Sequence, residues 1–480
     1  AVAAWVDALG GIDILHNNVG APAPGDPVEM SEEVWHANMA VNITTAFLTC
    51  KYALPVLAED GGGAVVNIAS IAGIRNLERS LVGYQAGKAA LIQLSKSIAA
   101  QWGPRNVRSN CILPGLMLTP LVLDRIVKAY PDEAARARAL AERCHMVPAG
   151  YMGDAWDTAW ASVYLASDEA KYVSGADLVV DGGLTAGRAL EWRKLAETSE
   201  PVAVPDAEAR SVSTGEARLA GKVALVFGAG SRGPGWGNGK AAAVLLARQG
   251  AKVLAVDLNL EAAEETRAVI ESEGGSCYAV AADATAATDV EKTVNECLHR
   301  FGSLDILLNN VGAAARGSPV DLDEAVWDAN IAFNTKPAFL ACKYAIPVME
   351  RQGGGSIIHT ASTSGLSVPE HGLISYQTGK AGLLQFSRGV GHLYARTGIR
   401  SNCIVPGKIR TPMTDATTAQ HNGADNVQRI YDQRAASVPL RRMGEGWDVG
   451  WAAVYLASDE ARYVNCAQIV VDGGLITSCC

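Results

Sequence analysis

Tyr376 and Lys380 are the residues of this chain whose types and spacing best fit catalysis. Side chains four positions apart on a helix project from one face and lie one turn apart. A phenol is a weak base with an ordinary pKa near ~10, and an ammonium group held close to it favours the phenolate and lowers that pKa. The hydroxyl of Ser362 could hold a substrate oxygen beside the phenol. Together the three groups could take a proton from an alcohol, or give one to a carbonyl, while another group accepts or donates hydride.

A tyrosine and a lysine at this spacing also occur as ordinary features of a solvated helix face. Recurrence favours the catalytic interpretation, because Ser70, Tyr84 and Lys88 repeat the pattern with the same spacing. The chain therefore contains two copies of one sequence unit, of which the second is complete.

The elements that must position these residues can be read from the second copy, in which short apolar segments alternate with helical patterns. We expect strands at 222–227, 252–256, 277–282 and 304–309, separated by helices at 240–249, 260–273 and 289–301. This alternation predicts a parallel sheet with helices on both faces. Binding sites in such sheets lie beyond the carboxyl ends of the strands. Polar or glycine residues follow the expected strand ends at Gly228, Asp257, Asp283, Asn310, Ser362 and Pro406-Gly407.

A glycine-rich turn between residues 228 and 239 follows the first strand of the second copy and opens a helix. In this context glycines let the backbone approach a pyrophosphate, and the helix N-terminus offers free N–H groups. Asp257, at the end of the next strand, would accept hydrogen bonds from a ribose and repel a 2′-phosphate, which favours NAD over NADP. Arg232 in the turn could meet that phosphate and argues for NADP. Asp283 would contact the adenine edge or, as an alternative, cap a helix.

The first copy lacks the part of the unit that precedes residue 304 in the second copy, including the glycine-rich turn. Either the sequence is a piece of a longer protein, which the missing initial Met favours, or the first copy is a genuine half-domain. We predict a truncated domain at 1–185, a flexible linker at 186–219 and a complete domain at 220–480. The first copy keeps counterparts of the catalytic residues, but we predict that it does not bind a dinucleotide; these counterparts are Asn42, Ser70, Tyr84 and Lys88.

The composition argues against several classes of protein. Hydrophobic residues make up 49% of the chain and charged residues 19%, which indicates a globular protein. The net charge of −9 is spread out without a basic patch, which argues against nucleic acid as the main partner. We expect no apolar run long enough to span a bilayer. The ten Cys are sparse and lack the spacing of a metal site, so we expect reduced thiols, no metal and a cytoplasmic protein.

As a set, these motifs resemble those of the short-chain dehydrogenase/reductase family, which are Rossmann-fold oxidoreductases. The resemblance covers residues 220–475 and, in truncated form, 1–185. It implies an α/β fold with a Rossmann-type doubly wound parallel sheet in two tandem copies, the first without its N-terminal nucleotide-binding half. The matching residues are the glycine turn, Asp257, Asp283, Asn309-Asn310-Val311-Gly312, Asn334, Ser362, Tyr376, Lys380 and Pro406-Gly407.

The resemblance also implies roles. Tyr376 looks like the catalytic acid and base, and Lys380 would lower its pKa and hold the nicotinamide ribose. Ser362 would position the substrate oxygen, and Asn334 would hold a water that connects Lys380 to solvent. The cofactor contacts implied in this way are Gly228, Ser231, Gly237, Gly239, Asp257, Asp283, Ala284, Asn310, Gly312, Tyr376, Lys380, Ile409 and Thr411.

The resulting expectation is an NAD(P)-dependent oxidoreductase that interconverts a secondary alcohol and a ketone, with NAD favoured. The alternatives are an epimerase or dehydratase that retains NAD, and a dinucleotide-binding scaffold without activity. The first copy would act as a built-in partner, pairing with the second through the long helices around Asn334 and Tyr376 and through the last strand, and the chain could also form a homo-oligomer. Arg441 and Arg442 could attract an acidic substrate, although the sequence favours a solvated charge pair.

Overall fold

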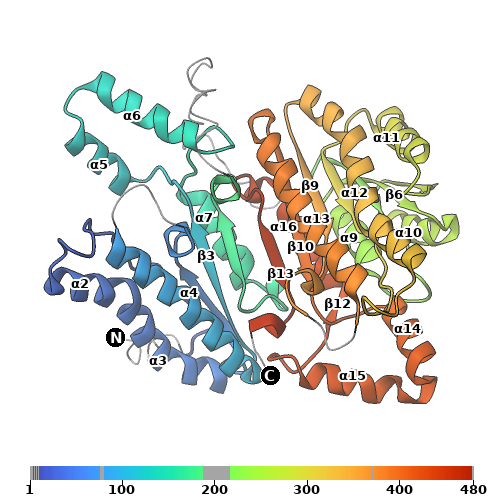
Figure 1. The fold of residues 1–480 in the computed structure, drawn as a ribbon, viewed down its shortest axis with the longest axis horizontal. Helices are drawn as coiled ribbons and strands as arrows, with labels where there is room; N and C mark the ends of the chain where they lie inside the picture. Colours follow the sequence, from blue (N-terminus) through green and yellow to red (C-terminus); the bar gives the residue numbers. More distant parts are fainter. Residues whose placement is uncertain are drawn as a thin grey trace.

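Two parallel sheets form the centre of the computed structural model, which describes residues 10–75, 81–187, 217–368 and 372–477 together with Ala4, Val6 and Ala8 (Figure 1). Most of the expected linker, residues 188–216, lies outside the described residues. The first copy contributes a four-stranded sheet in chain order, made of β1 (Ile14–Asn17), β2 (Gly63–Ile68), β3 (Val107–Pro114) and β4 (Asp177–Val180).

The second copy has a seven-stranded sheet in which every pairing is parallel. Its strand order is β13-β10-β9-β8-β5-β6-β7. The chain therefore runs outward from β5 to one edge, returns to β8 on the other side of β5, and runs outward to the opposite edge. This confirms the doubly wound sheet, and the point where the order reverses is where such folds bind ligands. The strands are β5 (Val223–Phe227), β6 (Lys252–Asp257), β7 (Cys277–Ala281), β8 (Ile306–Asn309), β9 (Gly355–Thr360), β10 (Ile399–Pro406) and β13 (Gln468–Val471).

Helices cover both faces of this sheet. One buried cluster joins the sheet to α9 and α16, and another joins it to α11 and α12. Asp323 is the N-cap of the long α12, and its carboxylate accepts a hydrogen bond from the Ala325 N–H and so satisfies a free donor of the first turn. The helices are α9 (Asn238–Arg248), α10 (Leu260–Ser272), α11 (Ala287–Phe301), α12 (Glu324–Gln352), α13 (Ile374–Leu393), α14 (Pro412–Asn422), α15 (Val427–Ala436) and α16 (Gly446–Ala457).

The first copy repeats the second half of this architecture and leaves one sheet edge open. Ile14 in β1 is 52% exposed, whereas its counterpart Ile306 in β8 is fully buried because β5 covers that edge. Within the described residues this copy has no counterpart of β5, β6 or β7, as predicted. Its helices are α2 (Glu32–Met39), α3 (Thr45–Glu59), α4 (Val82–Trp102), α5 (Pro120–Ala129), α6 (Glu133–Met146) and α7 (Ala155–Ala166).

The segment Glu32–Glu59, which spans α2 and α3, is long and apolar enough to cross a membrane by length and composition alone. The expectation that no apolar run reaches this length was therefore wrong. One such segment is weak evidence for a membrane span, because core helices of soluble proteins pass the same test; 33% of this window is buried against the rest of the chain. A π-helical turn, Ala40–Thr44, which contains Asn42, separates α2 from α3.

The two copies pack together through their last strands, β4 and β13, and through the helices that precede them (Figure 1). Tyr164 of α7 stacks on Tyr455 of α16 with ring centroids 4.4 Å apart, and both rings are buried in a core cluster that is continuous between the copies. The predicted pairing through the last strand is therefore present. The long helices α4 and α13 do not make the main contact; instead each touches the short C-terminal turn of the other copy, Leu475–Thr477 and Leu184–Ala186 respectively.

Candidate active site

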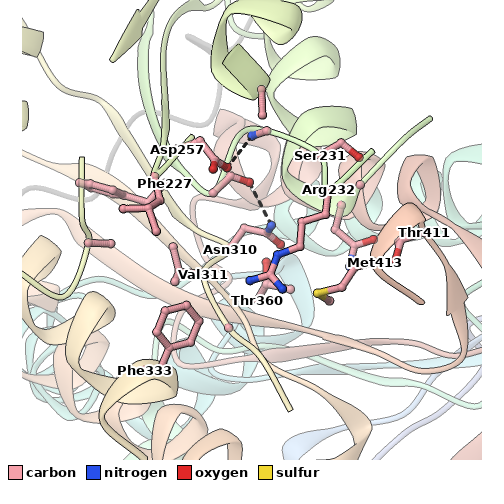
Figure 2. Close-up of a pocket in the computed structure, with 18 of the residues that line it drawn as sticks. Phe227, Ser231, Arg232, Asp257, Asn310, Val311, Phe333, Thr360, Thr411 and Met413 are labelled. Carbon is pink, nitrogen blue, oxygen red and sulfur yellow. Dashed lines mark hydrogen bonds between the residues drawn. The ribbon is translucent and has the colours of Figure 1, made fainter. Parts of the chain in front are cut away.

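A cavity of about 570 Å³ lies at the carboxyl ends of the strands in the second sheet, where the strand order reverses (Figure 2). This size suits a small-molecule or cofactor site. The cavity is lined by most of the residues that the sequence singles out in the second copy. The lining includes Gly228, Ser231, Gly237, Asp257, Asp283, Ala284, Asn310, Gly312, Ser362, Tyr376, Lys380, Ile409 and Thr411.

Gly239 and Asn334 are the two predicted residues of this copy that do not line the cavity; they lie directly behind its wall. Gly239 stands in the first turn of α9, where a Cβ would overlap the carbonyl oxygen of Gly228. Only glycine therefore lets the helix approach the turn that follows β5. This close approach brings the N-terminus of α9 to the cavity.

The glycine turn offers unpartnered polar atoms. Within the described residues, Ser231 Oγ and Asn238 Oδ1 are buried without a hydrogen-bond partner. A buried hydroxyl without a partner is costly, so it marks a place where a ligand group is expected. Beside the free N–H groups of the first turn of α9, a hydroxyl donor fits the phosphates of a dinucleotide. In Figure 2 the side chain of Arg232 points from this turn over the cavity.

Asp257 is fixed at the end of β6 by two backbone N–H groups. Its Oδ2 accepts from Gly230 at 3.0 Å and its Oδ1 accepts from Asn259 at 3.1 Å. The carboxylate thus lies at the cavity wall, where a ribose can reach it. Asp283 accepts from the backbone and side chain of Thr285 at 2.8 and 2.7 Å, so it orders its own turn while also lining the cavity.

Tyr376 and Lys380 stand on the first turns of α13, with Lys380 Nζ 5.8 Å from the centre of the tyrosine ring. Lys380 Nζ donates to the carbonyl of Thr360 at 2.8 Å, and burial lowers its pKa to about 8. Burial raises the pKa of Tyr376, and a hydrogen bond with Ser362 opposes that rise. This differs from the expectation of a lowered tyrosine pKa, because burial disfavours the phenolate more than its neighbours stabilise it.

Gly312, Asn334 and Lys380 converge behind the tyrosine. The Asn334 amide donates to the carbonyls of Ala313 and Asn330, at 2.8 and 2.9 Å. Its Oδ1 is buried, and no partner for it is found among the described residues. A Cβ on Gly312 would lie 2.7 Å from Lys380 Nζ and 2.9 Å from Asn334 Oδ1. The absent side chain of Gly312 therefore leaves the ammonium and the free acceptor facing one small space.

The first copy reproduces this arrangement without the cofactor half. Lys88 Nζ donates to Ile68 at 2.8 Å, lies 5.8 Å from the centre of the Tyr84 ring, and has its pKa lowered to about 8 by burial. Tyr84 is hydrogen-bonded to Ser70, and burial raises its pKa. Asn42 differs from Asn334 in that its Oδ1 accepts from the Ala21 N–H at 3.2 Å.

Sequence reasoning missed some of the residues that line the cavity. Phe333 and Met413 line the cavity, and their positions directly before Asn334 and shortly after Thr411 could have indicated it. Neither Arg441 nor Arg442 lines it. Arg442 instead donates to the carbonyl of Lys171 in the first copy, so it serves the contact between the copies.

The family model described as enoyl-(acyl carrier protein) reductase matches residues 1–185 and residues 234–476. The chain belongs to the short-chain dehydrogenase/reductase family. The two matches fall on the two tandem copies, so both belong to this family of oxidoreductases.

Relatives of this short-chain dehydrogenase/reductase chain match one copy or both. An uncharacterised short-chain type dehydrogenase/reductase, y4vI of Sinorhizobium fredii, is 30% identical over 97% of this chain and 79% of its own length. The 2,5-dichloro-2,5-cyclohexadiene-1,4-diol dehydrogenase LinX of Sphingobium indicum is 34% identical over 54% of this chain and 97% of its own length. A solved structure of a putative short-chain dehydrogenase/reductase from Burkholderia xenovorans is 47% identical, with a TM-score of 0.53, and covers 55% of this chain and all of its own.

Proposed function

We propose that the second copy is an NAD(P)-dependent dehydrogenase that interconverts a secondary alcohol and a ketone. The observation that carries the proposal is that Ser362, Tyr376 and Lys380 line the same cavity as the glycine turn. A dinucleotide held by that turn and an alcohol held by the tyrosine would therefore meet. The name of the LinX relative, a diol dehydrogenase, agrees with this class of substrate.

Each side chain has a role in this proposal. Tyr376 takes the hydroxyl proton of the alcohol, or returns a proton to the carbonyl oxygen in the reverse direction. Ser362 holds that oxygen next to the phenol. A nicotinamide cofactor supplies the hydride acceptor or donor. Lys380 binds the nicotinamide ribose, and Asn334 Oδ1 holds the water that carries protons between Lys380 and solvent, which accounts for its lack of a partner in the described chain.

We propose NAD as the preferred cofactor. Asp257 places a negative charge where the ribose of the adenosine would lie, and that charge repels a 2′-phosphate. Arg232 is the opposing feature, because its side chain reaches over the same cavity.

We propose that the first copy, taken as 1–185 and joined by 186–219 to the complete domain at 220–480, binds no dinucleotide and serves as a pseudo-dimer partner in a cytoplasmic protein. Its Ser70, Tyr84 and Lys88 have no glycine turn opposite them in the described residues. The continuous core between the copies supports the partner role.

The test is a panel of secondary alcohols and ketones with NAD or NADP, read by the absorbance of the reduced cofactor. Tyr376→Phe should abolish turnover and leave NAD binding within about twofold, because only the reacting hydroxyl is lost. Tyr84→Phe, the matched change in the first copy, should leave turnover unaltered. Turnover that survives Tyr376→Phe would contradict the mechanism, and NADH that never leaves the protein would point to an epimerase or dehydratase.

A further inference from the structure

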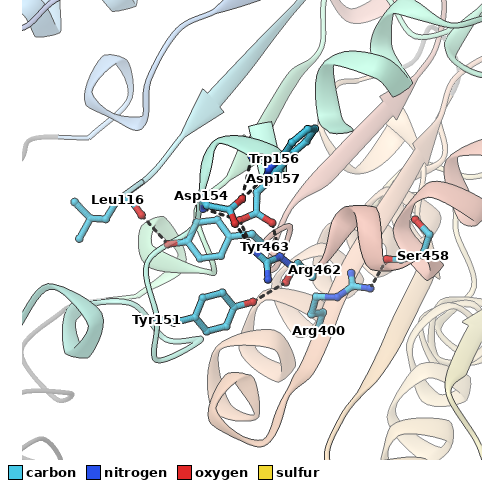
Figure 3. Close-up of polar contacts among 9 residues, drawn as sticks. All are labelled: Leu116, Tyr151, Asp154, Trp156, Asp157, Arg400, Ser458, Arg462 and Tyr463. Carbon is cyan, nitrogen blue, oxygen red and sulfur yellow. Dashed lines mark hydrogen bonds and ion pairs between the residues drawn. The ribbon is translucent and has the colours of Figure 1, made fainter. Parts of the chain in front are cut away.

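Two tyrosines cross the boundary between the copies in opposite directions. Tyr172 of the first copy and Tyr463 of the second follow corresponding short turns, Asp168–Ala170 and Asp459–Ala461, and both are fully buried. Tyr463 donates its hydroxyl hydrogen to the carbonyl of Leu116 in the first copy at 3.2 Å (Figure 3). Tyr172 points the other way, into the copy that contains the cavity.

The hydroxyl of Tyr172 lies within hydrogen-bonding distance of two carbonyls of the second copy, Lys408 at 3.3 Å and Arg442 at 3.2 Å. A two-stranded parallel ribbon follows both carbonyls, with β11 (Ile409–Arg410) paired with β12 (Gly444–Glu445). Lys408 directly precedes β11, and Arg442 lies shortly before β12. The Gly444 N–H also donates to the Lys408 carbonyl, at 3.0 Å. One phenol from the first copy therefore holds together the starts of both strands.

The ring of Tyr172 also fills the space behind the ribbon. A Cβ on Gly444 would lie 2.5 Å from two ring carbons of Tyr172 and 2.6 Å from the Ile409 side chain, so ring, glycine and isoleucine are in close contact. The guanidinium of Arg442 lies 5.0 Å from the ring centre of Tyr172 and donates to the carbonyl of Lys171 at 2.7 Å. These contacts fix the orientation of the phenol.

The ribbon forms part of the cavity wall. Ile409 and Thr411 line the cavity, and Met413 and Thr414 follow them in the lining. Thr411 is the N-cap of α14, with its side chain accepting from the Thr414 N–H, so the position of β11 also sets where α14 begins. A displacement of β11 would therefore move one side of the cavity.

We propose that Tyr172 is a positioning residue for the cavity of the second copy: the copy without a nucleotide-binding half holds the wall segment 408–414 in the place that cofactor binding needs. The inference rests on the proposed function, since it concerns the same cavity. Burial raises the pKa of Tyr172, so the hydroxyl stays protonated and remains a donor. The mirror contact of Tyr463 supports Met117 and Gly153, which belong to the copy without a glycine turn.

The mirror contact supplies the control. Tyr172→Phe and Tyr463→Phe, made in the full chain, each remove one buried interface hydroxyl and keep the ring. Both should lower the melting temperature by similar amounts. Only Tyr172→Phe should weaken NAD binding in a calorimetric titration, by roughly tenfold, and speed hydrogen exchange of residues 409–414, because only this hydroxyl holds the ribbon.

Three outcomes are distinguishable. Weaker NAD binding and faster exchange in Tyr172→Phe alone would support the inference. Equal NAD binding by the two variants, with the unchanged chain also binding NAD, would overturn the inference and leave the proposed function standing. Absence of NAD and NADP binding by the unchanged chain would overturn the proposed function, and the inference with it.

Discussion

Replacing Gly312 by Ala should lower the turnover of the second copy, whereas the matching change in the first copy, Gly20→Ala, should leave turnover unchanged. Gly312 does not have a left-handed backbone conformation, so alanine meets no backbone strain there. The added methyl group would lie 2.7 Å from Lys380 Nζ and 2.9 Å from Asn334 Oδ1. At Gly20 the corresponding distances are 2.7 Å to Lys88 Nζ and 3.0 Å to Asn42 Oδ1.

The two substitutions are thus nearly equal in steric terms. Overpacking by one methyl group costs about 1–3 kcal/mol in a well-packed interior, and we expect each variant to lose stability in that range. Turnover should respond differently. A shift of about 1 Å in Lys380 or Asn334 would misalign the groups around Tyr376 and lower kcat roughly 100-fold, whereas the same shift around Lys88 should leave kcat unchanged.

Urea unfolding gives the stability of each variant, and steady-state kinetics with the best substrate of the panel gives kcat. A kcat for Gly312→Ala equal to that of the unchanged chain would refute the argument that Gly312 leaves space for the catalytic groups. Equal losses of kcat in both variants would refute the claim that only the second copy is active.

Asp257→Ser should lower the ratio of kcat/KM for NAD to that for NADP by at least about tenfold, because the change removes a charge that repels a 2′-phosphate; an unchanged ratio would mean that another residue sets the preference. The contribution of Lys380 to stability should rise with pH between about 8 and 10.5, because burial lowers the pKa of Lys380 from 10.5 to about 8 and the unfolded chain therefore binds a proton in this range that the folded chain has released. Lys88 adds to the same slope. Lys380→Met should reduce the slope in pH-dependent unfolding experiments, and an unreduced slope would show that Lys380 stays protonated when folded.

Much of the second copy could be predicted from the sequence because its signals are local. Strands of apolar residues end at glycine or polar residues, and parallel strands bring those ends to one edge of the sheet. Asp257 and Ser362 lie far apart in the sequence, yet the alternation of strands and helices places both at the cavity. Among the residues missed, Phe333 and Met413 are apolar and carry no chemical signal of their own.

The contact between the copies could not be predicted in detail for a different reason. Tyr172 and Lys408 meet because two folded units pack together, and no periodicity or spacing links them. The expected pairing of long helices placed the contact on the wrong elements for the same reason. Arg442 is the clearest example. Two adjacent arginines in a sequence suggest a charged surface, whereas the guanidinium of Arg442 lies over the buried ring of Tyr172. The pKa of Tyr376 likewise depends on burial, which spacing does not determine.

The side of β1 that no described strand covers is a further difference between the two copies. In the described chain its backbone N–H and C=O groups on that side have no neighbouring strand, whereas the equivalent groups of β8 are bonded to β5. Such a margin is a template for strand addition. An extended segment paired along that side of β1 would continue the first sheet in the way that β5 continues the second.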